Sequence, residues 1–458
     1  MSPTPPTLTE IRALVHGRVI GPEDAEYDAA RTVVVGGIDR RPAAIVRVAD
    51  ADDVSRVIGL AREHGLELAV RSGGHSAVGH SVTNGGIVID LHDMKRLDVD
   101  VEGRSAWADA GLTAGEVTTA LAEHHLAVGF GDTASVGIGG ITLGGGIGYL
   151  VRKHGLTIDS LLAAEIVTAD GDVLTISETE RPDLFWAIRG GGGNFGVVTR
   201  FQYRLHPLGQ VYGGFLFLPA TPETVAGAVA AAEAASEDLS AIINVMPLPP
   251  MPFIPEEHAG KMAVFLLGVY SGDPADGAEA FAPFRALAEP FGDLLRPMAY
   301  PEIYPPAPEE EYHPIVAQRN MFLDRVDLPV AQTIMERLAS IDSPMKAVQL
   351  RVLGGAMARV PADATAFAHR SSRIMAQLVA MHSGGTDGEA KQAWVDALAS
   401  AIQQGDRRAY VNFVADEGLD GVHTAYPGAT WDRLVEVKRR YDPTNLFHLN
   451  QNVPPTAS

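Results

Sequence analysis

The stretch that decides the fold is Val70–Ser76, which reads VRSGGHS and is followed by a short apolar run, Gly86–Leu91 (GIVIDL). Upstream, the mostly apolar Ala43–Ala49 predicts a buried strand, and Asp50 can cap a following helix that Gly65 ends. The residues just before the glycine turn predict a second strand, and GIVIDL predicts a third. Strand, helix and strand leading into a glycine-rich turn indicate an α+β nucleotide-binding unit.

Two more glycine-rich elements follow, at Gly137–Gly148 and at Gly190–Gly196. Backbone N–H groups can converge on a pyrophosphate only where side chains leave room, and glycine supplies that room and unusual dihedral angles. The last element contains a formal G-x-G-x-x-G at Gly191, Gly193 and Gly196. A helix-like stretch precedes it and a strand-like stretch follows it, which is the reverse of the dinucleotide fingerprint. The sequence therefore argues against a Rossmann fold.

The composition excludes several classes of protein. Over 458 residues, 36 Lys and Arg stand against 57 Asp and Glu, a formal charge of −21 that disfavours binding to nucleic acid or to an anionic membrane. The chain has no cysteine, so disulfides, thiolate metal sites, Fe–S clusters and cysteine nucleophiles are excluded. It has no zinc-protease motif, no secretory-type start and no apolar run of membrane-spanning length, so we expect no metal and a cytoplasmic protein.

The character of the sequence changes near Pro207, where we place a domain boundary. Beyond it, alanine-rich segments predict helices and apolar runs between them predict strands. The helix predictions are Glu223–Ala235, Thr365–Met381, Ala390–Gln403 and, interrupted by Pro283, Ala278–Leu287. The strand predictions are Ala263–Tyr270 and Val348–Leu353, and the proline-rich loop predictions are Met246–Pro255 and Pro301–Pro308.

These motifs together resemble the berberine-bridge-enzyme-like oxidases, a branch of the vanillyl-alcohol-oxidase superfamily with the p-cresol-methylhydroxylase-type FAD domain. The resemblance rests on VRSGGHS with GIVIDL, and on Ser135–Tyr149 (SVGIGGITLGGGIGY), Lys153–Asp159 (KHGLTID), Asp183–Thr199 (DLFWAIRGGGGNFGVVT) and Tyr441–Pro455 (YDPTNLFHLNQNVPP). It implies an α+β fold in two parts. Residues 1–207, completed by about 425–458, would bind FAD, and residues 208–424 would bind the substrate on a mainly antiparallel sheet covered by helices.

The resemblance also implies how FAD is held. His75 is expected to bond through its ring to the flavin, since a neutral imidazole nitrogen is a competent nucleophile near neutral pH. Many relatives add a bond from a cysteine, but Thr133 stands at that position, so we expect attachment through His75 only. Val136 is small enough to be compatible with access of O2.

Further cofactor contacts follow from the same resemblance. Backbone amides of Arg71–Ser76 and Gly137–Gly148 should cradle the pyrophosphate, with no helix N-terminus required. The expected cofactor-binding residues besides His75 are Arg71, Ser72, Gly73, Gly74, Ser76, Gly79, Asp132, Thr133, Val136, Gly137, Gly139, Gly140, Gly144, Gly145, Gly148, Gly196, Val198, Asn450 and Asn452.

Candidate catalytic residues lie near the end of the second part. In the family a tyrosine of a Y-x-N-Y strand often acts as the base, but the second tyrosine is Phe413 here. Tyr410 and Asn412 would share one face of such a strand, although Tyr410 could equally be a core tyrosine with a satisfied hydroxyl. Gln349 and Arg351 would share a face toward the flavin, with a solvated strand face as the alternative.

The resemblance therefore predicts an FAD-dependent oxidase. It would remove a hydride from an alcohol, hemiacetal or amine carbon of a small sugar or secondary metabolite, with O2 as acceptor and hydrogen peroxide as product. A dehydrogenase that uses another acceptor, and a flavin-binding protein without oxidative turnover, remain open.

Overall fold

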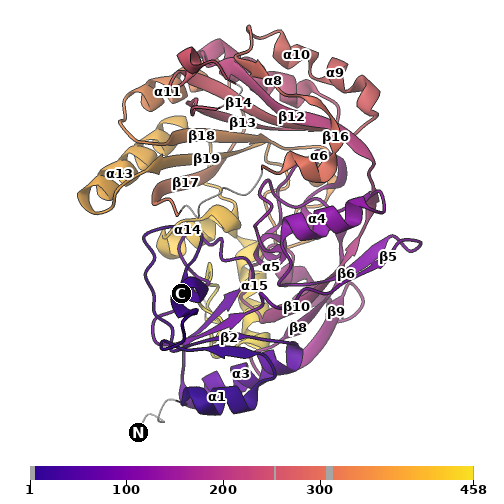
Figure 1. The fold of residues 1–458 in the computed structure, drawn as a ribbon, viewed down its shortest axis with the longest axis vertical. Coiled ribbons are helices and arrows are strands. Elements are labelled where there is room, and N and C mark those ends of the chain that lie inside the picture. Colours follow the sequence, from indigo (N-terminus) through magenta and orange to yellow (C-terminus); the bar gives the residue numbers. More distant parts are fainter. Residues whose placement is uncertain (1–5, 252–253, 306–312, 457–458) are drawn as a thin grey trace.

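The computed structural model describes residues 6–251, 254–305 and 313–456, and it shows a mixed α+β fold whose strands are mainly antiparallel (Figure 1). Two smaller sheets form the half at the bottom of the view, and one large sheet with its helices forms the half at the top (Figure 1). The predicted loops at 246–255 and 301–308 fall partly outside the described residues, and β13 extends into the first of them, to Pro247.

A four-stranded sheet carries the VRSGGHS turn. Its order is β1 (Arg18–Ile20), β2 (Ala44–Arg47), β4 (Ile87–Asp90), β3 (Leu68–Arg71), preceded by α1 (Leu8–Leu14) and with α2 (Tyr27–Arg31) between β1 and β2. Strands β2, β4 and β3 are parallel. Helix α3 (Ala51–His64) begins where the Asp50 side chain accepts from the Asp53 N–H and ends at Gly65 with φ +64°, so the predicted cap and stop are confirmed. The turn after β3 therefore leaves the sheet at its carboxyl edge.

The second sheet is antiparallel and shares its core with the first. Its order is β5 (Leu97–Asp100), β6 (Ser105–Asp109), β10 (Val197–Arg204), β8 (Leu161–Val167), β9 (Val173–Ser177). Helix α3 contacts strands of both sheets, and one continuous apolar core joins them. Helix α7 (Pro182–Ile188) precedes the third glycine element and β10 follows it. The order opposite to the dinucleotide fingerprint is thus confirmed.

Short elements connect these sheets around the second glycine element. They are α4 (Ala114–Ala122), β7 (Leu126–Ala127), α5 (Ile138–Gly144), α6 (Val151–His154), the 3-10 turn η1 (Thr157–Ser160) and β11 (His206–Pro207), which pairs with β7. The expected cradle did not require a helix N-terminus, and the structure has one in this segment, because α5 begins directly after Gly137.

The large sheet dominates the other half. Its order is β15 (Gly292–Asp293), β12 (Gln210–Pro219), β14 (Met262–Tyr270), β13 (Leu239–Pro247), β18 (Lys346–Val352), β19 (Ile374–Met381), β17 (Val316–Leu323), and β16 (Arg296–Ala299) also pairs with β12. Its helices and turns are α8 (Pro222–Ala234), η2 (Glu256–His258), η3 (Pro274–Asp276), α9 (Gly277–Ala280), α10 (Ala282–Arg285), η4 (Tyr300–Ile303), α11 (Leu328–Ala339), α12 (Ala356–Arg359) and α13 (Gly385–Ile402). Helices α8, α11 and α13 cover the outer face, so the inner face looks toward the smaller sheets (Figure 1).

The predicted helix at Thr365–Met381 is wrong. Residues 365–373 are irregular, and the rest form β19, which pairs with β17 on one side and β18 on the other. Alternate residues from Ile374 to Ala380 are buried in the core under the helices, which is the period of a strand. Alanine favours a helix only weakly, and burial between two strands overrides that preference. The predicted strands at Ala263–Tyr270 and Val348–Leu353 are confirmed as β14 and β18.

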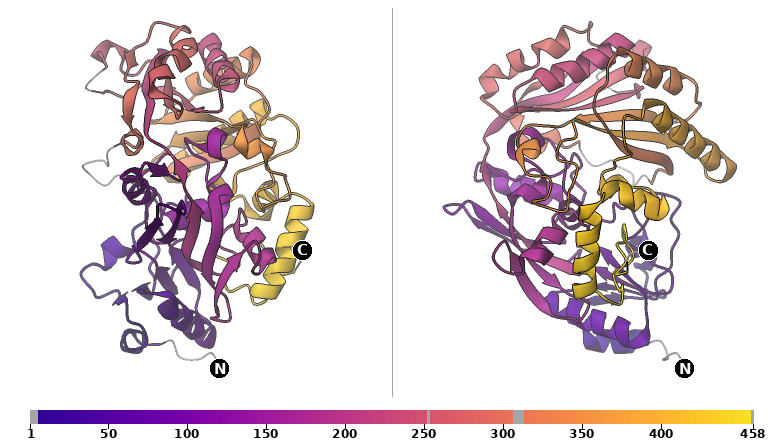
Figure 2. Two further views of the ribbon diagram at one scale, coloured as in Figure 1. Left: turned by 90° about the vertical axis from the view of Figure 1, so that its right-hand side faces the viewer. Right: turned by 180° about the vertical axis from the view of Figure 1, so that it is seen from behind.

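The C-terminal segment returns to the first half. Helices α14 (Gly418–Ala425) and α15 (Ala429–Tyr441) follow the 3-10 turn η5 (Val411–Phe413), and the chain then runs back beside the smaller sheets (Figure 2). The fully buried Lys438 ammonium donates to the Asp442 carboxylate at 2.6 Å and to the carbonyls of Asn194 and Phe447. This buried pair fastens the C-terminal tail to the third glycine element. Among the described residues, no helix is long and apolar enough to cross a membrane.

Candidate functional site

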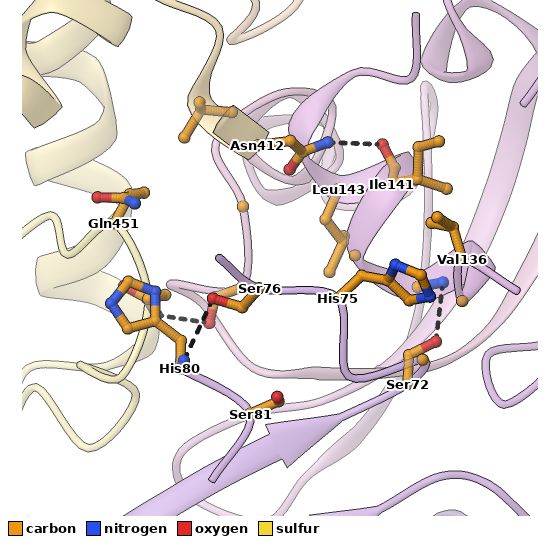
Figure 3. A pocket seen from close by; sticks show the side chains of 18 of the residues that line it. Ser72, His75, Ser76, His80, Ser81, Val136, Ile141, Leu143, Asn412 and Gln451 are labelled. Carbon is orange, nitrogen blue, oxygen red and sulfur yellow. Dashed lines mark hydrogen bonds between the residues drawn. The ribbon is translucent and has the colours of Figure 1, made fainter. Parts of the chain in front are cut away.

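A cavity of about 520 Å³ lies where the glycine elements, the inner face of the large sheet and the C-terminal segment meet. The glycine elements contribute the turn after β3, the start of α5 and the segment before β10. The large sheet contributes Gln349, Arg351 and Gln377, and the C-terminal region contributes residues 410–414, 447 and 449–451. Figure 3 shows His75, Val136 and Ser72 close together on one wall, with Asn412 above them. Segments far apart in the sequence thus share a single chamber.

Most of the expected site residues line this cavity. They are Ser72, Gly73, Gly74, His75, Ser76, Asp132, Thr133, Val136, Gly137, Gly139, Gly140, Gly196, Val198, Gln349, Arg351, Tyr410, Asn412 and Asn450. The others do not line the cavity, namely Arg71, Gly79, Gly144, Gly145, Gly148 and Asn452. Arg71 is buried and donates to the carbonyls of Ala30 and Ser81. Through these bonds Arg71 connects the end of β3 to the segments around Ala30 and Ser81.

Three of the glycines that do not line the cavity let neighbouring segments approach closely, because they carry no side chain. A Cβ on Gly144 would overlap the Asn412 side chain, and one on Gly148 would overlap the Phe130 carbonyl. Gly145 has φ +133°, which side-chain-bearing residues rarely adopt. These glycines therefore let the wall of the cavity pack against the segments behind it.

The first two glycine elements touch each other at their backbones. A Cβ on Gly73 would overlap the Gly137 amide, and a Cβ on Gly137 would overlap the Ser72 hydroxyl and the Gly73 amide. By contrast, a Cβ on Gly140 or Gly193 would meet nothing within 4 Å. The two loops thus pack tightly where Gly73 meets Gly137, which we call the seam, and they leave space on the side that faces the cavity. Together these loops form what we call the cradle. Its wall is made of backbone, which fits a phosphate-containing cofactor.

His75 stands on this wall with its ring held by a neighbour. Its Nε2 lies 3.1 Å from the Ser135 hydroxyl, a partner that the sequence did not single out. Burial lowers the pKa of His75 below its ordinary value, so the imidazole is neutral at pH 7. A second histidine, His80, also lines the cavity, and burial lowers its pKa to about 4. Both rings can therefore offer a lone pair to a ligand.

Tyr410 and Asn412 do not lie on a strand, and that prediction is wrong. Residues 411–413 form η5, in which the Phe413 N–H donates to the Tyr410 carbonyl at 2.9 Å. The two side chains still meet, because the Asn412 amide donates to the Tyr410 hydroxyl oxygen at 2.8 Å. The Gly146 N–H donates to the same oxygen at 2.9 Å. Tyr410 is thus both buried and part of the cavity wall.

The Tyr410 hydroxyl is under opposing influences. Burial raises its pKa above the ordinary value, while the Gly146 and Asn412 donors and the Arg351 charge lower it. Burial is the larger effect, so the side chain is a neutral phenol at pH 7. Two donors already aimed at the oxygen would stabilise negative charge there if a proton left.

Arg351 is not on a solvated strand face, which settles that alternative. It is 4% exposed, and its guanidinium donates to the Asp132 carboxylate at 2.7 Å, the Ile147 carbonyl at 3.1 Å and the Gln349 amide oxygen at 2.9 Å. Its charge also lies 5.3 Å from the centre of the Phe413 ring. Arg351 therefore joins the large sheet to the glycine-rich loops across the cavity.

A row of amide side chains crosses the inner face of the large sheet. Of its residues, only Gln349 was expected from the sequence. Asn244, Gln349, Gln377 and Asn320 stand opposite one another on β13, β18, β19 and β17. The Gln349 amide donates to Asn244 at 2.9 Å, and the Gln377 amide donates to Gln318 at 3.1 Å. Period-two alternation in β19 was the available signal for Gln377, but the helix prediction concealed it.

Two family models match the chain. One, described as an FAD binding domain, matches residues 42–177, and the other, described as berberine and berberine like, matches residues 409–454. (R)-6-hydroxynicotine oxidase of Paenarthrobacter nicotinovorans is 31% identical over 466 residues, covering 97% of this chain and 98% of that protein.

Solved structures of oxidases have a similar fold. The crystal structure of 6-hydroxy-D-nicotine oxidase from Arthrobacter nicotinovorans has a TM-score of 0.86 and 27% identity, with coverage of 96% of this chain and 98% of that one. Glucooligosaccharide oxidase from Acremonium strictum, whose structure is described with 6-S-cysteinyl, 8α-N1-histidyl FAD, has a TM-score of 0.84. It is 23% identical and covers 98% of this chain and 100% of that one, which is a likeness of fold.

Proposed function

This chain belongs to the berberine-bridge-enzyme-like FAD-linked oxidoreductases of the vanillyl-alcohol-oxidase superfamily, and we propose that it is an oxidase of a small molecule. Its substrate carbon would be that of an alcohol, hemiacetal or amine in a sugar or secondary metabolite. The observation that carries the proposal is the 520 Å³ cavity, which joins a backbone cradle bearing His75 to a polar sheet face. Residues 1–207 with 425–458 would hold the cofactor, and residues 208–424 would hold the substrate.

The residues present fit FAD. The seam between Gly73 and Gly137 leaves backbone facing the cavity, which suits the pyrophosphate, and Gly196, Val198 and Asn450 line the same chamber. His75, neutral at pH 7, would provide the covalent link. It would be the single link, because Thr133 stands where many relatives have a cysteine. Bound FAD supplies two-electron oxidation of the substrate carbon, with O2 as acceptor and hydrogen peroxide as product.

In this proposal Tyr410, in its deprotonated form, takes the proton of a substrate hydroxyl. The Gly146 N–H and the Asn412 amide donate to its oxygen, and both contacts would be strongest to the negatively charged tyrosinate, the form that can accept that proton. Arg351, held in place by Asp132, adds a positive charge nearby. The first tyrosine of the motif would thus act as the base although Phe413 replaces the second.

The class of substrate decides whether this base is needed. An alcohol or hemiacetal must lose its hydroxyl proton as the carbon is oxidised, whereas a neutral amine carries no such requirement. Among the residues lining the cavity, the Asp132 carboxylate is paired with Arg351. That pairing favours a neutral, hydroxyl-bearing substrate over a protonated amine.

The first experiment is a visible spectrum of the purified protein, repeated on the acid-precipitated pellet and on its supernatant. Yellow colour that stays in the pellet, and is lost from the pellet of His75→Ala, supports the covalent link. The matched control is His80→Ala, which removes another histidine of the same cavity and should keep its colour in the pellet. Colour in the supernatant would refute the link but leave bound FAD. A protein that binds no FAD at all would overturn the proposal.

Oxidase and dehydrogenase are separated by reoxidation. After anaerobic reduction by substrate, the flavin colour of an oxidase returns rapidly on mixing with air, whereas slow return would identify a dehydrogenase. A flavin that no alcohol, hemiacetal or amine bleaches would identify a binding protein without turnover.

A further inference from the structure

A second cavity, of about 280 Å³, lies behind Tyr410 and shares none of its lining residues with the first. It is bounded by β17, by the C-terminal end of α13, by the segment that leads into Tyr410, and by α14. Its polar lining includes Arg319, Arg407, Arg408 and one acidic side chain, Glu417. The family models and the proposed oxidation leave this cavity without a role.

The guanidinium groups of Arg407 and Arg408 keep hydrogen-bond donors that their ion pairs do not use, whereas Arg319 pairs with both Glu417 and Asp396. Arg319 and Arg407 both donate to the Glu417 carboxylate, at 2.6 Å and 3.0 Å, and Arg408 donates to Asp324 at 2.6 Å. Arg407 and Arg408 each make one such ion pair through Nη2, although a guanidinium carries five N–H donors. Two cationic side chains of the lining, Arg407 and Arg408, therefore have N–H donors available for a further acceptor.

Asn320 supplies the independent observation. It is 4% exposed, and its Oδ1 accepts from the Tyr410 N–H at 2.6 Å, which fixes the orientation of the amide. Its Nδ2 is buried and has no hydrogen-bond partner among the described residues. A buried donor left without an acceptor is costly, so a ligand that brings acceptor atoms to this cavity is favoured.

We propose that this cavity binds a small oxyanion, the phosphate or carboxylate group of a metabolite, between Asn320, Arg407 and Arg408. An oxyanion offers only acceptors, which the free N–H donors of Arg407, Arg408 and Asn320 can use, and charge-assisted bonds to arginine are among the stronger hydrogen bonds. The chain as a whole carries a formal charge of −21, so an anion that binds it needs such a specific site.

The site would communicate with the main cavity through one residue. The Asn320 amide would contact the anion with Nδ2 while its Oδ1 holds the Tyr410 N–H. Binding would therefore fix the backbone at Tyr410, whose side chain lines the first cavity. The anion would act as an effector at a distance from the substrate.

The test is binding to the flavin-loaded protein, measured by calorimetry and thermal unfolding with inorganic phosphate, citrate or sodium chloride at equal ionic strength. We expect saturable binding of phosphate or citrate and a higher Tm than in chloride. Phosphate alone, or citrate alone, would identify which oxyanion chemistry the cavity takes. An equal effect of chloride, or no saturable binding, would overturn the proposal.

The decisive variant is Asn320→Asp, which keeps an acceptor for the Tyr410 N–H and replaces the free donor by a carboxylate oxygen. Anion affinity should fall at least ~10-fold, the scale of one charge-assisted bond. Arg325→Gln, which removes a charge in the same region outside the lining, should leave affinity unchanged. If Asn320→Asp does not fold, Arg407→Gln, at a half-exposed side chain, should give the same loss. Unchanged affinity in the folded variants would overturn the site.

Binding is read without substrate turnover, so its outcome is independent of the oxidase proposal.

Discussion

The two walls of the main cavity are built by different means. On one side, glycine loops after β3 and before α5 present backbone, and their geometry depends on missing side chains. On the other side, the inner face of the large sheet presents long polar side chains whose positions depend on one another. The first wall suits a ligand whose chemistry does not vary, and the second can change its specificity by single substitutions. A cofactor and a substrate make those two different demands.

The walls also differ in how they resist change. The loops meet at backbone atoms of Gly73 and Gly137, which cannot move aside without shifting the chain. The sheet wall is a chain of hydrogen bonds from Asp132 through Arg351 and Gln349 to Asn244. If one of these side chains were removed, its neighbours could replace the lost hydrogen bond with one to water or to another side chain. We therefore expect a substitution in the glycine loops to abolish flavin binding almost completely. A substitution on the sheet face should lower activity by an amount that depends on the residue.

The largest effect should come from Gly137→Val. Its side chain would overlap the Ser72 hydroxyl and the Gly73 amide, so the two loops must separate and the cradle is lost. We expect nearly complete loss of flavin, measured as the ratio of flavin to protein absorbance. Gly59→Ala, on a helix position where a Cβ meets nothing within 4 Å, is the control and should bind fully. A normal flavin content in Gly137→Val would show that the seam is not the cradle.

Tyr410→Phe should follow, with flavin content retained. Removal of a general base costs typically ~10²–10⁴-fold in kcat, and we expect that loss with an alcohol or hemiacetal substrate. The measurement is steady-state turnover together with the rate of anaerobic flavin bleaching. With an amine substrate the loss should be small, and a small loss with an alcohol would exclude Tyr410 as the base.

The same residue predicts a pH dependence. Burial raises the pKa of Tyr410, so the phenol is protonated at neutral pH and the basic form is gained as pH rises. The rate of bleaching by an alcohol should therefore climb from neutral pH toward at least about 10, the ordinary tyrosine value. Tyr410→Phe should flatten the profile, and a wild-type profile that is already flat above neutral pH would contradict the assignment.

Arg351→Met should have an intermediate effect. It removes the cross-cavity bonds to Asp132 and the Ile147 carbonyl, and a hydrogen bond to a charged group contributes about 1.5–3 kcal/mol. We expect kcat/KM to fall ~10–100-fold, on the scale of 1.4 kcal/mol for each factor of ten. A double-mutant cycle with Asp132→Asn measures the coupling, and strictly additive losses would mean that the two do not act together.

Gln377→Ala should have the smallest effect. Its amide makes a neutral bond to Gln318, and such a bond contributes about 1 kcal/mol, so KM should rise roughly 5-fold with kcat nearly unchanged. Gln332→Ala, at an exposed glutamine of α11, is the matched control. A fall in kcat larger than the change in KM would move Gln377 from substrate binding to the chemistry.

Local signals predicted the cofactor side of the molecule well. Asp50 and Gly65 bound α3 as expected, because a cap and a left-handed stop act within a few residues. Most of the expected cofactor residues line one cavity. The half built on the large sheet was predicted less well. Its alanine-rich strand β19 was mistaken for a helix, and Tyr410 and Asn412 meet across a 3-10 turn instead of along a strand.

The sequence by itself determined the α+β class, the glycine-rich elements, the position of His75 and the absence of a cysteine that could bond to a cofactor. Each of these is a property of a short segment or of composition. The tertiary structure alone decided which polar side chains stand together. Arg351 meets Asp132 across 219 positions of the chain, and Gln349 meets Asn244 across 105. Such contacts depend on strand order and register, which are fixed only when the whole sheet packs against its helices and the loops close over it.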